Sequence, residues 1–504
     1  MHTKKIIEYF SLFFSNNRPI HVANILIGFN VLVFISSAYA FYLNGHNSSY
    51  VNSETMIMAF FIAMQIHFSL SIRKLKSDPF VLILSSITII YYCFRIFTLL
   101  IFDTSDTIIR NEAYTANDTT YALYVIFLCN LSMLAAFYFV ARKKTQYFKF
   151  TSHNYNHFIN SLLVLVPILL ILHILNVWLV IASFSRVAIA SLSLINIHWF
   201  IYFSMIIILF RQTRNLSVLK SQNFFILVLI MIYGFWLMVS GSRGYFIFFI
   251  EISLVGLISL NQFYIKKRQA LKFLLFAPAI LFIFYVVFMF ASDQRLHVSS
   301  KQKITGIFNN FESLLYQHKH DTNEIISNLK KLTNRVGYLD MSSEIISNRN
   351  KYDFLFTPNF YAKSFVDNIF TPGFDIFDTP KVARSLYFIH QDVNNKIPSK
   401  KFGINNNIIH SDMLTIYGEF FMFFGWWALA IIFLWAYLLK WLYYLKLKKV
   451  NFMLGIFKRP TILLLFYFCL NSFGIDWIIS TYLAPIIFTL ISLSIYHKFF
   501  FRKK

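Results

Sequence analysis

The stretch 80–102 reads FVLILSSITIIYYCFRIFTLLIF, 23 residues with a single charge at Arg95. About 20 predominantly apolar residues in a helix cross the roughly 30 Å hydrocarbon core of a bilayer. A run of this length and composition therefore predicts a transmembrane helix.

The composition of the whole chain agrees with that stretch. Of 504 residues, 57 % are hydrophobic and 13 % charged, and the mean hydropathy is +0.58. These values exclude a soluble enzyme, a secreted disulfide scaffold and a disordered protein. Cys93, Cys129 and Cys469 all lie in apolar runs, where we interpret them as small buried side chains rather than metal ligands or a disulfide.

Twelve stretches are long and apolar enough to be spans, which predicts an all-α polytopic membrane protein with about 12 transmembrane helices. They cover approximately 20–43, 55–72, 80–102, 119–140, 159–183, 190–210, 223–239, 245–263, 273–291, 414–439, 460–475 and 479–497. The predicted organisation is helices 1–9 in residues 1–291, an external loop subdomain at 292–413 between helices 9 and 10, and helices 10–12 in residues 414–504.

The distribution of Lys and Arg predicts the orientation, because short loops rich in these residues stay in the cytoplasm. With both termini inside, the predicted cytoplasmic segments hold 27 of the 46 Lys and Arg residues, and the short external loops hold three. Only Glu8 and Asp78 offset the cytoplasmic bases. Topology thus accounts for the formal net charge of +24, and no nucleic acid partner is needed to explain it.

The segment 292–413 is the one long stretch between spans, and it is predicted to face outward. Its first half has apolar residues at helical spacing, and its second half, 353–380, is aromatic and rich in turn residues. No cytoplasmic segment exceeds about 20 residues, and the chain contains no Walker, dinucleotide or zinc-protease motif. We therefore expect any chemistry at the external face, without a nucleotide, a cofactor or a metal. His318 and His320 have metal-like spacing but no third ligand nearby, and we interpret them as a solvated loop.

Arg243 is the most informative basic residue of the short external loops. It lies in Ser240-Gly241-Ser242-Arg243-Gly244, where the glycines let backbone N–H groups approach an anion. We interpret Arg243 as a phosphate or diphosphate ligand, with snorkelling to lipid headgroups as the alternative. Glu251 in span eight and Arg95 in span three are charges inside spans, and we expect them to form a structural ion pair.

Three further positions in the long segment carry candidate chemistry. Arg335 and Arg384 are each followed three residues later by a tyrosine, and on a helix such pairs share one face. The pairs Arg335 with Tyr338 and Arg384 with Tyr387 suit sugar or phosphate binding, and surface charges are the alternative. His410, in His410-Ser411-Asp412 just before span ten, is suited to take a proton from a hydroxyl or to act as an interfacial hydrogen-bonding residue.

Two motifs in this topology resemble a known family. Gly241-Ser242-Arg243-Gly244 lies at the outer end of a helix pair, and Tyr417-Gly418-Glu419-Phe420 with Phe424-Gly425-Trp426 follows the large external loop. In this arrangement the chain resembles the O-antigen and capsule polysaccharide polymerases of the Wzy type. The related O-antigen ligases also place Arg and His residues around the corresponding loop, but Gly418 and Gly425 fall at offsets that favour a polymerase.

The resemblance implies a metal-independent glycosyltransferase of the bacterial inner membrane, acting in lipopolysaccharide or capsule biosynthesis. Its substrate and partner would be an undecaprenyl-diphosphate-linked oligosaccharide in the lipid bilayer, and a polysaccharide chain-length regulator is a further candidate partner. Arg243, Arg335 and Arg384 would bind the diphosphate or glycan with Tyr338 and Tyr387. His410 would be the base, and Asp412 or Glu419 would orient or replace it.

Two other classes remain open beside polymerase and ligase. A lipid-linked oligosaccharide flippase would also have about twelve spans, but it should line a central cavity with cations deep in its spans, where this sequence has only Arg95. A dolichyl-type glycosyltransferase would need acidic residues in the first external loop. Glu54 is the only one there, although Asp103 and Asp106 follow in the second.

Overall fold

The computed structural model describes residues 20–44, 48–103, 114–140, 264–265, 338–347, 349–351, 357–369, 377, 415–445 and 452–471. Within these ranges the chain is mostly helical, and two short strands, β1 (Ile20–His21) and β2 (Tyr264–Ile265), pair antiparallel. The predicted spans 159–183, 190–210, 223–239, 245–263, 273–291 and 479–497 lie outside the described residues.

Among the described residues, five apolar helical stretches are long enough to cross a membrane, and each overlaps a predicted span. They are α2 (Val22–Leu43), α3 (Ser53–Ser71), the continuous run of α4, η1 and α5 (Pro79–Phe102), α6 (Ala116–Phe139), and the run of α17, η3 and α18 (Ile416–Tyr444). A shorter apolar stretch, Thr461–Leu470, lies in α19 (Phe452–Asn471) at the predicted span 460–475. A mostly helical protein with several membrane-length helices is confirmed.

Polar residues fix where these helices begin. Asn52 and Thr55 form a reciprocal capping box at the start of α3, and Thr115 and Asp118 form another at the start of α6. Asp78 caps α4 (Pro79–Thr88) by accepting a hydrogen bond from the Phe80 backbone N–H at 3.0 Å. These side chains satisfy N–H groups that the first turn of a helix leaves without an intrahelical partner.

The third span contains a π-helical turn, η1 (Ile89–Cys93), between α4 and α5 (Phe94–Phe102). The wider turn inserts an extra residue into the helix, and such turns occur frequently at functional sites. Here it contains two consecutive buried tyrosines with different neighbours. The Tyr91 ring meets Tyr338, and the Tyr92 ring meets Tyr417.

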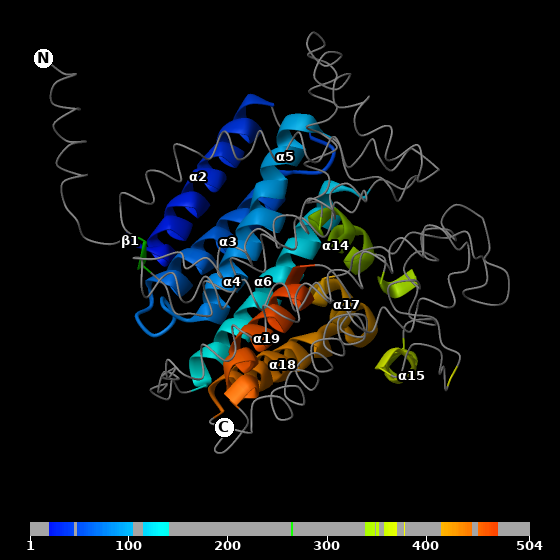
Figure 1. Cartoon of the computed structure of the whole chain (residues 1–504). Coiled ribbons are helices and arrows are strands. Elements are labelled where there is room, and N and C mark those ends of the chain that lie inside the picture. The colour runs from blue at the N-terminus through cyan, green and yellow to red at the C-terminus, as the bar shows by residue number, and fades with distance from the viewer. Residues whose placement is uncertain are drawn as a thin grey trace, which may run out of the picture.

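Helix α6 is central to the described bundle (Figure 1). Helices α3, α14 (Tyr338–Ser347) and α18 (Ala428–Tyr444) all pack against it, and α2 packs on α3 and α5. Phe80, Phe137 and Phe466 pack their rings together where α4, α6 and α19 meet. One apolar core therefore joins spans from both ends of the sequence.

The helix ends gather into two groups. At one end, Ser48 donates to Asp103 and Asn52 donates to Asn117. At the other end, His21 lies 2.9 Å from the Ser77 hydroxyl, and Lys74 donates to the Tyr138 carbonyl. Neighbouring segments that the predicted topology puts on one side of the membrane thus lie together in the structure.

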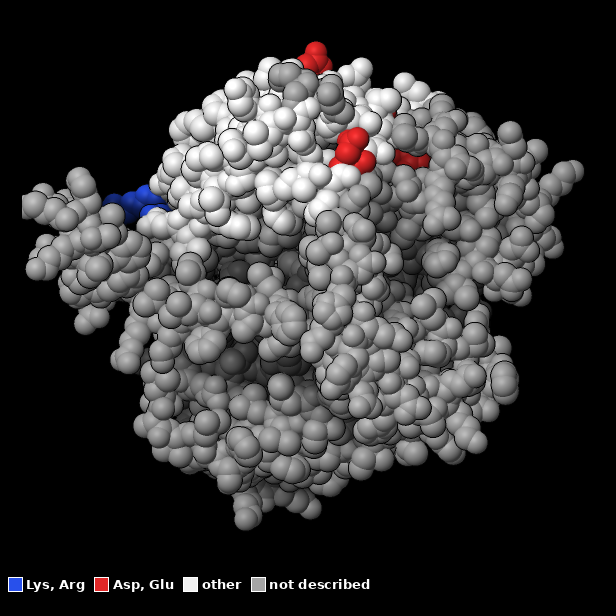
Figure 2. Space-filling view, turned by 90° about the horizontal axis from the view of Figure 1, so that it is seen from above, with Lys and Arg blue, Asp and Glu red and all other residues white. Residues whose placement is uncertain are grey.

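Charge divides between these two ends. The second group contains Arg73, Lys74, Lys76 and Lys440, and we call it the basic end. The first contains Glu54, Asp103 and Asp118, and we call it the acidic end. In Figure 2, acidic side chains (red) stand out on the described surface, and the basic side chains in view (blue) lie at its left edge.

The run Ile416–Tyr444 is not one straight helix. It turns at Gly425, whose φ is +56°, a backbone conformation that glycine adopts without steric cost. Tyr417 of α17 (Ile416–Phe424) bonds Asn130, in the half of α6 nearer the basic end, whereas Phe421 packs on Tyr121 near its start. Helix α17 therefore runs towards the acidic end, and α18 then returns to the basic end.

Trp427, the last residue of η3 (Gly425–Trp427), and Trp441 of α18 are both exposed. Exposed tryptophans are typical of the interfaces of a membrane. The structure divides the predicted span 414–439 between the short helix α17 and the longer helix α18.

Two helices of the long predicted loop are described, α14 and α15 (Pro358–Ile369). The stretch 353–380, expected to be rich in turns, contains α15, because Thr357 accepts from the Phe360 N–H and Pro358 takes the first helical position. Helix α14 lies beside η1 and α6 rather than beyond the ends of the spans. Its buried Leu339, Ile345 and Ile346 explain that position.

Candidate functional site

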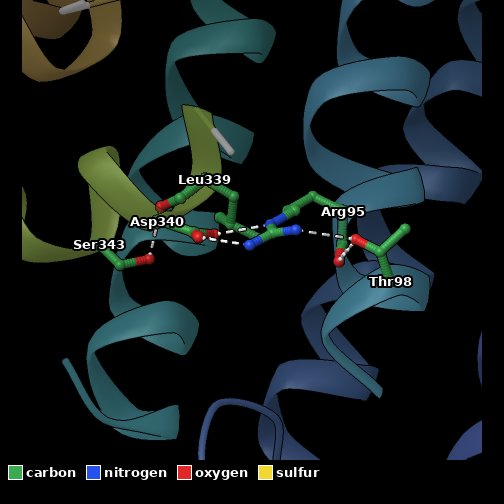
Figure 3. Close-up of polar contacts among 5 residues, drawn as sticks. All are labelled: Arg95, Thr98, Leu339, Asp340 and Ser343. Atoms are coloured by element: carbon green, nitrogen blue, oxygen red, sulfur yellow. Dashed lines mark hydrogen bonds and ion pairs between the residues drawn. The ribbon is translucent and has the colours of Figure 1, made fainter. Parts of the chain in front are cut away.

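A buried ion pair joins the third span to α14 (Figure 3). Arg95 Nε donates to Asp340 Oδ1 at 3.0 Å, and Arg95 Nη2 donates to Oδ2 at 2.6 Å. Arg95 is 0 % exposed and Asp340 is 3 % exposed. This two-pronged geometry is the strongest form of an Arg–carboxylate contact. The expected partner of Arg95, Glu251, lies outside the described residues, and the carboxylate seen with Arg95 is Asp340.

The local structure holds both partners in place. Arg95 follows the π-helical turn directly, and its Nη1 donates to Thr98 Oγ1, one turn further along α5, at 3.2 Å. The Tyr338 ring, two positions before Asp340, packs edge-on against Tyr91 with ring centroids 4.6 Å apart. Arg95 is seven positions from the end of α5, so the pair lies about 10 Å inside the acidic end of the span.

Tyr114 adds a third polar group beside this pair. It stands just before α6 and is 8 % exposed. Burial raises the pKa of Tyr114 well above its ordinary value, and the Asp340 charge raises it further, whereas the Arg95 charge lowers it. The hydroxyl therefore keeps its proton and is available as a hydrogen-bond donor.

Glu419 is a second buried carboxylate, on α17. It is 0 % exposed, and the Tyr361 hydroxyl of α15 donates to its Oε1 at 2.7 Å. The Tyr361 ring packs among aromatic rings of α15 and α17: Phe365, Phe420, Phe423 and Phe424. The Tyr361 hydroxyl, held in place by these aromatic contacts, thus bonds the carboxylate that is proposed above as an alternative base.

Arg349 stabilises the turn that follows Glu419. It belongs to η2 (Arg349–Lys351), and its Nε donates to the Phe421 carbonyl at 3.0 Å, near the end of α17. A cation is favourable there because the carbonyl groups at a helix C-terminus carry partial negative charge. A Cβ added at Gly425 would come within 3.1 Å of the Arg349 guanidinium carbon. Gly425 therefore gives this turn both its backbone conformation and the space for Arg349.

A third cluster of polar groups lies deeper in the bundle. The Tyr417 hydroxyl donates to Asn130 Oδ1 at 2.7 Å, and Asn130 Nδ2 donates to Thr88 Oγ1 at 3.4 Å. These bonds join α17, α6 and α4. Buried polar groups with partners of this kind favour one arrangement of the helices over its alternatives.

Two of the predicted site residues are described, and they lie on neighbouring helices. Tyr338 is on α14 and Glu419 is on α17, which pack together. The other six lie outside the described residues: Arg243, Arg335, Arg384, Tyr387, His410 and Asp412. Tyr338 is buried against Tyr91, so in this conformation its ring contributes to packing.

Sequence reasoning missed Asp340, Tyr361 and Arg349. The available signal for Asp340 was an arginine inside a span, which demands a carboxylate from somewhere in the chain. Tyr361 and Arg349 act through hydrogen bonds to α17, which no local pattern predicts.

The chemistry of the described residues is that of charged and hydroxyl groups. No group of three or more His, Cys, Asp or Glu residues that could hold a metal ion occurs among them. The three cysteines are buried free thiols, as expected. The arrangement can bind an anion through Arg95, and it offers a buried carboxylate, Glu419, for proton transfer.

The fold and this site define a class: a helical membrane protein with ionic and hydroxyl groups buried in one half of its bundle. The chain matches no known family model, no curated protein and no solved structure.

Proposed function

We propose that this protein is a glycan polymerase of the Wzy type. The observation that carries the proposal is the position of Asp340 and Glu419. Helix α14, from the long segment between predicted spans nine and ten, enters the acidic half of the bundle to meet Arg95, and Glu419 lies on the adjacent helix α17. In that half the Arg95 cation suits an anionic substrate carried by a lipid, and the Glu419 carboxylate suits proton transfer from a hydroxyl.

In this proposal the basic end faces the cytoplasm and the acidic end faces the periplasm of a bacterial inner membrane, with both termini inside. The orientation follows from the rule that short loops rich in Lys and Arg stay cytoplasmic. The site then lies on the outer side, where a lipid-linked repeat unit is found after it has been flipped.

The proposed reaction transfers a growing glycan from undecaprenyl diphosphate to a lipid-linked repeat unit. The acceptor hydroxyl oxygen bonds to the anomeric carbon, and the bond from that carbon to the diphosphate oxygen breaks. The hydroxyl proton passes to His410, or to Asp412 or Glu419, and undecaprenyl diphosphate leaves. Arg243, Arg335 and Arg384, with Tyr338 and Tyr387, bind the diphosphate and glycan, and the arginines stabilise the charge that develops.

The described pair bears on the flippase alternative. A flippase needs cations that line an open cavity within its spans. Within the membrane-length stretches that the structure describes, Arg95 is the one Lys or Arg deep inside a span, whereas such a cavity needs several. This supports a polymerase over a flippase. A ligase remains the nearest alternative, because its substrates have the same chemistry.

The experiment is to delete the gene in its own bacterium, separate the surface glycans by size, and measure the pool of lipid-linked intermediates. A polymerase predicts loss of the long ladder with single repeat units still on the final acceptor. Long polymer accumulating on the lipid carrier would mean a ligase. Single repeats trapped on the cytoplasmic leaflet would mean a flippase.

Complementation with variants then tests the site. Arg243→Ala is expected to leave the deletion phenotype uncorrected although the protein is present in the membrane. Arg186→Ala, in another short loop predicted to be external, is the matched control and should restore the ladder. A normal ladder with Arg243→Ala would remove Arg243 from the site.

A further inference from the structure

The groups around the Asp340 carboxylate form a small set of hydrogen-bond donors. Two N–H groups of Arg95 point at its two oxygens, from Nε and Nη2. Tyr114 lies close enough for the Asp340 charge to raise the pKa of its hydroxyl. The carboxylate therefore stands in a site built to receive an anion.

A guanidinium fork binds a phosphate group with the same two-pronged geometry that it uses for a carboxylate. The two contacts differ in which molecule supplies the anion: the protein itself supplies a carboxylate, and a ligand supplies a phosphate. Asp340 belongs to α14, in the long segment between predicted spans nine and ten, whereas Arg95 belongs to a membrane-length helix. If one partner moves, it is therefore the carboxylate on α14 rather than the cation in the span.

Charge makes the two anions compete. One guanidinium balances one negative charge, and two anions held within a few ångströms of each other repel strongly where water is excluded. A phosphate group that reaches Arg95 would therefore expel Asp340, and α14 would leave its place beside η1 and α6.

We propose that Arg95 and Tyr114 form a phosphate-binding site in the acidic half of the bundle, that Asp340 occupies it in this structure, and that a phosphate or diphosphate group displaces Asp340 and undocks α14. The inference deepens the proposed function and rests on it for the nature of the ligand, which would be the diphosphate of the lipid carrier. Docking of α14 is measurable without any polymer being made, so the two proposals can fail separately.

The reporter is Ser343→Cys on α14. Ser343 is 0 % exposed and donates to the Leu339 carbonyl four residues earlier. Ser37 on α2 is the matched control, because it is also buried and donates to the Val33 carbonyl with the same spacing. Glu54→Cys, on the exposed acidic end, gives the rate of an accessible thiol. Native cysteines that react in the parent chain set the background, and all three are buried.

The full chain would be placed in phosphatidylcholine nanodiscs, and its reaction with a maleimide followed with and without inorganic pyrophosphate. Ser343→Cys should react slowly alone and about tenfold faster with pyrophosphate, because losing one charged hydrogen-bonded contact is worth at least that factor. Asp340→Asn should give the same acceleration without pyrophosphate. Ser37→Cys should not respond.

The outcomes divide as follows. If phosphatidylglycerol nanodiscs accelerate labelling and pyrophosphate does not, the site takes a lipid phosphate rather than a free one, which still supports the proposal. No acceleration by either probe overturns it, as does an acceleration that persists in Arg95→Gln. Pyrophosphate could accelerate labelling although deletion of the gene leaves a normal glycan ladder. In that case the phosphate site would stand and the proposed polymerase function would be wrong.

Discussion

Two buried ion pairs at opposite ends of the bundle look alike and differ in every surrounding detail. Lys440 Nζ lies 2.6 Å from Asp78 Oδ2, and Arg95 Nη2 lies 2.6 Å from Asp340 Oδ2. At the basic end, Asp78 also caps α4, and Lys440 also donates to the Phe137 carbonyl and lies near the Phe137 ring. Those groups belong to membrane-length helices.

The pair at the acidic end joins such a helix to a short one. Its neighbour Tyr114 is buried beside the Asp340 charge. The comparison shows that a distance alone does not separate a structural ion pair from a functional one. What separates them is whether both partners belong to membrane-length helices.

The largest effect should come from breaking the Asp78–Lys440 pair. Asp78→Leu leaves the buried Lys440 without its carboxylate, and removing one partner of a buried pair costs about 3–5 kcal/mol. We expect little folded protein in membranes. The double variant Asp78→Leu with Lys440→Met removes both charges and should recover most of it. Thermal unfolding in detergent is the measurement, and a double variant no better than the single would contradict a simple pair.

Arg95→Met should have a smaller and more local effect. The unpaired Asp340 can leave the bundle with α14, so the free energy of unfolding of the spans should fall by less than about 2 kcal/mol. Hydrogen exchange should rise in 338–347 and stay unchanged in 428–444. Thr98→Val, which removes one hydrogen bond to Arg95, is the control and should cost about 1 kcal/mol. Equal loss of protection in both segments would make this pair as structural as the other.

Gly425→Ala tests the turn between α17, which runs towards the acidic end, and α18, which returns to the basic end. Its positive φ and the 3.1 Å approach of Arg349 both oppose a side chain there. A strained backbone of this kind costs about 1–3 kcal/mol. Gly28→Ala in α2 is the matched control, because nothing lies within 4 Å of the added carbon and alanine favours a helix. We expect a lower melting temperature for the first variant and an equal or higher one for the second.

The smallest effect concerns pH at the basic end. Burial lowers the pKa of His21 below its ordinary value, and the Lys76 charge lowers it further. A folded state that binds the proton less well than the unfolded state loses stability as the pH falls. The contribution of neutral His21, which accepts from the Ala23 N–H, is thus complete above about pH 6.5 and declines below it. His21→Asn keeps a side chain that can cap the helix. In this variant the melting temperature should depend less on pH between pH 7 and pH 5, and the difference from the parent protein should be close to the precision of the measurement.

The spans that the structure describes could be predicted from sequence because hydropathy is a local property. The run 80–102 agrees with Pro79–Phe102 to within one residue. The partner of Arg95 could not be predicted, because Asp340 is 245 positions away and Glu251 was an equally acidic choice. The turn at Gly425 was also missed. An apolar run long enough for a span gives no sign that its first third reverses direction, and only the glycine marked the place.

The most direct test of this account compares two charge-free double variants in the deletion strain. Arg95→Met with Asp340→Leu, and Asp78→Leu with Lys440→Met, should both be present in membranes, because replacing a whole buried pair by apolar side chains is often tolerated. The account predicts that the first produces no long glycan ladder and the second produces a normal one. A normal ladder from the first would show that Arg95 serves only to hold the fold, and would contradict the account.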